Sequence, residues 1–112
     1  MPNTPIQDTT LAQLRDALEQ AKAIAAAATE NDIYEAANES QASIQERIST
    51  VLNLQLAGDT AQMQAQAANV TTAKAAFDAA AKNLTTANDV VTATADFLGA
   101  VDALIKVASH FA

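Results

Sequence analysis

The stretch MQAQAANVTTAKAAFDAAAKNLTTANDVVTATADFLGAVDALIKVASHFA (residues 63–112) has an apolar residue at every seventh position. We call this set the heptad seam; it comprises Met63, Val70, Phe77, Leu84, Val91, Leu98 and Ile105. The positions three residues further on are mostly Ala, which lets two helical backbones approach closely. A seven-residue apolar repeat is typical of helices that pack lengthwise against one another. The second half of the chain is therefore predicted to form long, closely packed helix.

The first half of the chain contains two further helical patterns. In the first, Leu11, Leu14 and Leu18 alternate steps of three and four, after the residues Asp8-Thr9-Thr10 that favour a helix start. The second runs from residue 32 and has an apolar side opposite a polar side, as an amphipathic helix does. It is predicted to end near Gly58, because Gly readily adopts the conformation that ends a helix.

The polar side of that second pattern carries a group of carboxylates. We call them the acidic face; they are Asp32, Glu35, Glu39 and Glu46, which cluster when residues are plotted at about 100° per position. A solvated helix surface is the simplest interpretation of such a stripe. The functional alternative is a docking strip for a basic protein, whose association would depend strongly on salt.

Two all-α architectures fit these patterns, because the sequence does not decide whether the chain bends near residues 30 and 87. Capping residues at both junctions permit a new helix to start, but no Gly or Pro forces the preceding helix to end. At the second junction Thr86 and Asp89 have the spacing of a capping box. If both junctions bend, the chain is an antiparallel up-down bundle of four helices, over about residues 9–29, 32–57, 60–84 and 87–110. If both stay helical, it is one long antiparallel hairpin folded at Gly58. We favour the bundle, because a hairpin with so few bulky residues would bury little apolar surface.

The N-terminal residues 1–8 include both prolines of the chain and lack helical periodicity. They are expected to form a flexible lead-in, followed by a single domain over residues 9–112. The start has neither the basic region nor the apolar run of a Sec signal peptide. We therefore expect a cytoplasmic protein, or one exported by a route that does not use such a signal.

The composition limits the partners and the chemistry of the protein. Of its 112 residues 29 are Ala, none is Cys, and the net charge is −7. This acidity argues against nucleic-acid binding and against attraction to an anionic membrane, and it favours a basic protein partner. The absence of Cys excludes disulfides and Cys-ligated metals.

Catalytic motifs are missing from the sequence. His110 is the only His, no Glu stands three residues before it, and no phosphate-binding or nucleophile-elbow motif occurs. We therefore expect no enzymatic activity, no cofactor and no metal site.

Three functions remain consistent with the sequence. The first is a small acidic interaction module that binds another protein, as adaptors, immunity proteins and secretion chaperones do. The second is a secreted or self-assembling structural protein, because the composition of residues 65–91 is similar to that of exported bacterial helical proteins such as the ends of flagellin. The third is an amphipathic coat on a lipid or granule surface. The first is preferred; self-association into a homo-oligomer is compatible with it.

Overall fold

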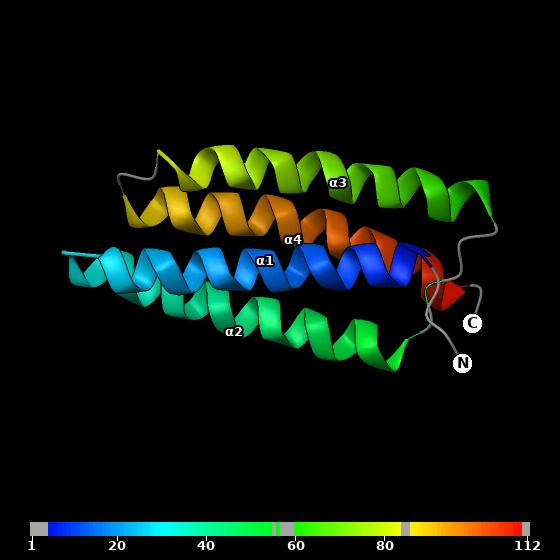
Figure 1. Cartoon of the computed structure of the whole chain (residues 1–112), viewed down its shortest axis with the longest axis horizontal. Coiled ribbons are helices and arrows are strands. Elements are labelled where there is room, and N and C mark those ends of the chain that lie inside the picture. Colours follow the sequence, from blue (N-terminus) through cyan, green and yellow to red (C-terminus); the bar gives the residue numbers. More distant parts are fainter. Residues whose placement is uncertain (1–4, 55, 57–59, 84–85, 111–112) are drawn as a thin grey trace.

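Four α-helices make up the structure, a computed structural model that describes residues 5–54, 56, 60–83 and 86–110 (Figure 1). Their bounds are Pro5–Ala27 (α1), Asn31–Asn53 (α2), Ala61–Ala81 (α3) and Ala87–His110 (α4). The predicted all-α bundle of four helices is confirmed. The alternative of one long hairpin is wrong, because residues 28–30 and residues 82, 83 and 86 are not helical. Gly58, at which both architectures turn, lies outside the described residues.

The helices form two antiparallel hairpins that stack side by side. Helix α1 packs against α2, α3 packs against α4, and the hairpins meet through the pairs α1/α3 and α2/α4. Figure 1 shows that α1 and α3 run in one direction and that α2 and α4 run in the other. The pairs between hairpins are therefore parallel. Helices α2 and α3, although consecutive in the chain, lie on a diagonal of the bundle.

The core runs the length of the bundle, which measures 45 × 22 × 19 Å. Its largest fully buried side chains include Phe97, Leu14, Ile44 and Leu104. The rings of Phe77 and Phe97 join α3 and α4, with their centroids 5.6 Å apart. Because much of the remaining core is Ala, these few bulky residues supply most of the buried apolar area.

The heptad seam describes α3 but not α4. Met63, Val70 and Phe77 are buried, whereas Val91 is 50% exposed, which corrects the predicted register. The core of α4 lies one residue earlier in the repeat, at Val90, Phe97 and Leu104. The physical reason is the break between Ala81 and Ala87: the helical phase is reset there, so the spacing from Phe77 to Val91 carries no structural meaning. Of the remaining members, Leu98 is buried, Ile105 is half-buried and Leu84 lies outside the described residues.

The helix ends differ from the predicted bounds in ways that local chemistry explains. Helix α1 begins at Pro5, so residues 5–8 are helical and not part of a lead-in; Pro is well tolerated in the first turn of a helix. Gln7 in that first turn is buried, and its amide donates to Val51 O (2.6 Å) and accepts from Leu56 N (3.0 Å). Helix α2 ends at Asn53, before the predicted Gly58, because Leu54 is already extended and Leu56 is fully buried.

Side-chain caps begin α3 and α4. Thr60 accepts from Met63 N at 3.1 Å. Thr86 and Asp89 form the predicted capping box, in which Asp89 N donates to Thr86 Oγ1 (3.2 Å) and Thr86 N donates to Asp89 Oδ2 (3.1 Å). Helix α2 starts differently, since Glu30 is its N-cap and makes no side-chain cap hydrogen bond.

Candidate functional site

A groove of about 330 Å³ lies between the parallel helices α2 and α4. Small side chains line most of it. Its residues are Ala36, Glu39, Ser40, Ser43 and Arg47 of α2 and Val91, Thr94, Ala95, Leu98, Gly99 and Asp102 of α4. The hydroxyls of Ser40 and Thr94 hydrogen-bond each other across the base at 2.7 Å, so the base of the groove is closed by a satisfied polar pair.

The acidic face borders this groove. Glu39 is one of the lining residues, and Asp32, Glu35 and Glu46 are exposed on the same side of α2, within about 60° of Glu39 around the helix axis. Asp32 also lies in the first turn of α2, where a carboxylate stabilises the helix end. Of the four predicted residues, Glu39 therefore lines the groove, and the other three are exposed on the same side of α2 without lining it.

An ion pair closes one end of the groove. Arg47 of α2 donates from Nε and Nη2 to the two carboxylate oxygens of Asp102 on α4, both at 2.9 Å. The hydrogen bond to Asp102 raises the pKa of Arg47 above its ordinary value. Glu46 lies 3.6 Å from the same guanidinium. Because Asp102 already balances the charge of Arg47, the described lining of the groove is left with the negative charge of Glu39.

One row of residues on the α4 wall of the groove is exposed. Val91, Ala95 and Gly99 follow one another at steps of four residues, and all three are exposed. A Cβ added at Gly99 would meet no atom within 4 Å. Gly in the middle of a helix costs about 1 kcal/mol relative to Ala, so this residue weakens α4 even though the described residues leave room for an Ala side chain there.

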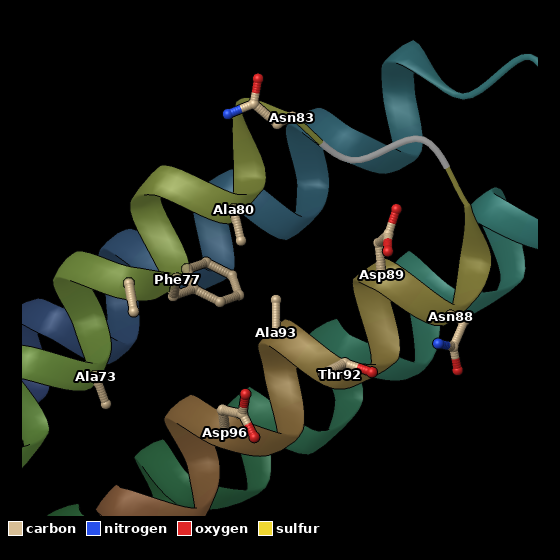
Figure 2. Close-up of a pocket in the computed structure, with 10 residues that line it drawn as sticks. Ala73, Phe77, Ala80, Asn83, Asn88, Asp89, Thr92, Ala93 and Asp96 are labelled. Carbon is tan, nitrogen blue, oxygen red and sulfur yellow. The ribbon is translucent and has the colours of Figure 1, made fainter.

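A second groove, of about 410 Å³, lies between α3 and α4 (Figure 2). Figure 2 shows the ring of Phe77 between the two helices, near Ala80 and Ala93, with Asp89 and Asp96 along α4. Asp89 is committed to the capping box, and the groove reaches Asn83 and Asn88, on either side of residues that lie outside the described part of the chain. The α2/α4 groove is the better candidate, because it combines a fully described lining with the acidic face.

The described residues hold no cluster of three or more His, Asp or Glu side chains that could bind a metal ion. None of the four helices, over their described residues, combines the length with the hydrophobicity that a membrane-spanning segment needs. The side chain of His110 lies outside the described part of the chain. Comparisons with protein-family models, with curated proteins and with solved structures find no match to this chain.

Sequence reasoning found the α2 side of the groove but missed the α4 side. The acidic face could be recognised because it belongs to a single helix. The heptad seam places Val91 in the core, and Gly99 belongs to none of the patterns described above. Two signals pointed to them: a Gly in the middle of an otherwise regular helix, and an α4 segment that is apolar on more sides than one core face needs.

Proposed function

We propose that this protein is a non-catalytic interaction module that binds a basic segment of another protein along the acidic face of α2. The observation that carries the proposal is the position of the acidic face, four exposed carboxylates on one side of α2. One of them, Glu39, lines a groove in which Arg47, the only cation among the described lining residues, is already paired with Asp102. Opposite charge on the partner would speed association and would make it sensitive to salt.

Binding to a charged peptide of known sequence tests this proposal. The probe is a fluorescent, synthetic amphipathic peptide made of Lys, Leu and Ala, compared with a version in which Gln replaces every Lys. Fluorescence anisotropy at several salt concentrations, from about 0.05 M to about 0.5 M, reports the dissociation constant. We expect the Lys peptide to bind at low salt, to weaken as salt rises, and to bind more tightly than the Gln peptide throughout.

Two variants with the same change in net charge locate the binding surface. The first neutralises the acidic face through D32N, E35Q, E39Q and E46Q. The second neutralises four exposed carboxylates elsewhere through D8N, E19Q, E30Q and D96N. We expect the first variant to lose most of the affinity and the second to keep most of it. Equal losses in the two variants would show that only the net charge matters and would refute the proposed surface.

A further inference from the structure

We infer that the segment received by the α2/α4 groove is a basic α-helix of the partner protein, which lies along the groove and brings a small residue against Gly99. This inference rests on the proposed function and specifies the shape and chemistry of the partner. Three features of the groove support it, namely its lining, its length and its charge.

The lining favours a helix over an extended peptide. An extended segment needs hydrogen-bond partners for its own backbone, and those are supplied by a sheet edge or by polar side chains. The α4 wall offers Val91, Ala95 and Gly99, which supply none from their side chains, and the hydroxyls of Ser40 and Thr94 already bond each other. Arg47 and Asp102 are paired with each other, so the polar side chains that remain are Glu39 and Ser43, both on α2. A helix forms its backbone hydrogen bonds internally, so it can lie against such a wall without leaving backbone N–H and C=O groups unpaired.

The length and the position of Gly99 define how the helix would lie. From Val91 to Asp102 the wall spans twelve residues, which is about 16 Å of helix and matches about three turns of a partner. Gly99 lies within this span, is exposed and has open space where a Cβ would stand. Close helix contacts require small residues at the crossing point, and Gly99 provides one that the chain itself does not use. The exposed Val91, two turns away, provides an apolar anchor.

The charge selects a basic partner over a second copy of this chain. Glu39 lines the groove, and Asp102 neutralises Arg47 at the far end. Asp32 and Glu35 are exposed near the start of α2, on the same side of the helix as Glu39. A second copy would bring a further net charge of −7 to this surface. A helix with Lys or Arg on its polar side complements the same carboxylates, and its apolar side covers Val91.

The experiment measures how tightly two peptides of different conformation bind to protein variants in which a bulky side chain fills one of the grooves. In the protein, G99L and A95L place a bulky side chain on the α4 wall, and A76L places the same side chain in the α3/α4 groove as the matched control. The probes are the Lys-Leu-Ala peptide locked as a helix by a side-chain staple, and a Pro-substituted peptide of the same charge that cannot be helical. Far-UV circular dichroism checks that each variant is folded, and sedimentation velocity gives its oligomeric state.

We expect G99L and A95L to weaken binding of the stapled peptide at least about tenfold and A76L to change it by less than about threefold. The Pro-substituted peptide should bind at least about tenfold more weakly than the stapled one. Two results would refute a helical partner in the groove while leaving the proposed binding along the acidic face standing. One is salt-sensitive binding that neither G99L nor A95L weakens, and the other is salt-sensitive binding of equal strength for the two peptides. A dimer that G99L or A95L dissociates would assign the groove to a second copy and overturn the inference. If neither peptide binds the unaltered protein, the proposed function fails, and the inference fails with it.

Discussion

Replacing Lys74 by Met tests whether the polar contact between α1 and α3 stabilises the fold. Lys74 lies on α3 with its side chain only 9% exposed, and its ammonium contacts Asp16 of α1 at 2.6 Å and Asp78 of α3. Gln20 of α1 donates to both carboxylates. Met preserves the buried aliphatic stem and removes the charge, so the substitution isolates the two ion pairs.

The size of the effect follows from the exposure of the partners. The side chains of Asp16 and Asp78 are 60% and 41% exposed, so water can replace much of what the ammonium provides. At such exposure each pair contributes roughly 0.2–1 kcal/mol, and we expect Lys74→Met to lower the free energy of unfolding by about 0.4–2 kcal/mol. Lys74→Ala should cost about 2 kcal/mol more, because it also removes three buried methylene groups.

The pH dependence gives the sharper test. The hydrogen bond from Lys74 holds the pKa of Asp16 below its ordinary 3.8, so this contribution is complete above pH 3.8 and is lost as the pH falls through the lower, folded value. Burial lowers the pKa of Lys74, but the hydrogen bonds to Asp16 and Asp78 outweigh it and raise that pKa above 10.5. Its contribution is therefore complete below pH 10.5 and is lost as the pH rises through the folded value. Between these limits the stability difference should be constant.

Urea unfolding followed by far-UV circular dichroism, at neutral pH and at about pH 2, measures the difference between Lys74→Met and the unaltered protein. We expect the difference to shrink at acid pH, because protonation of Asp16 removes its attraction for the buried ammonium. A difference of the same size at both pH values would show that Met disturbs the packing and that the ion pairs contribute nothing.

Three further substitutions have expected effects that thermal unfolding can measure. Gly99→Ala should raise the free energy of unfolding by about 1 kcal/mol, since the added methyl group meets no atom; a loss of stability would contradict the open space beside α4. Gln7→Leu should cost about 1–3 kcal/mol, because it removes the buried hydrogen bonds to Val51 O and Leu56 N, and an unchanged midpoint would refute their role. Thr86→Ala should cost about 0.5–2 kcal/mol by removing the cap of α4, whereas Thr86→Ser should retain most of the stability.

The helices themselves could be predicted from the sequence because their signals are local. Periodicity located all four, and the capping box at Thr86 and Asp89 was recognisable from spacing alone. The register of α4 could not be predicted in the same way, because the helix carries two apolar repeats of seven residues. One comprises Val90, Phe97 and Leu104, and the other comprises Val91, Leu98 and Ile105. Local periodicity cannot choose between two apolar stripes on one helix. The choice depends on packing, in which Phe97 meets Phe77 across the core.

The pairing of the helices, and with it the groove, depends on contacts that are distant in sequence. Short connections between consecutive helices favour α2 next to α3, yet these two helices lie on a diagonal. Glu39 and Gly99 face one groove only because α2 packs in parallel against α4. The acidic face was therefore predictable as a stripe on one helix, while the groove beside it was not.

Polar pairs explain why this parallel arrangement has one register. The contacts between α1 and α3 are Gln13–Thr71, Asp16–Lys74 and Gln20–Asp78, all at a separation of 58 residues. If α3 slid along α1 by seven residues, one Ala-rich surface would replace another. Apolar packing therefore discriminates only weakly between the observed register and the shifted one. The same shift would place Lys74 opposite Thr9 or Ala23 and remove its carboxylate partner on α1.

The other parallel pair follows the same logic. Arg47 meets Asp102 at a separation of 55 residues, and a shift of α4 by seven residues would place Arg47 opposite Ala95 or Ser109. A largely buried cation without its carboxylate is costly, so each parallel pair penalises the wrong register through one charged residue. Because both ion pairs join the two hairpins, they fix the position of one hairpin along the other. That position places Glu39 across the groove from Val91 and Ala95. The two ion pairs therefore determine which residues line the groove, although the Ala-rich core alone would allow other registers.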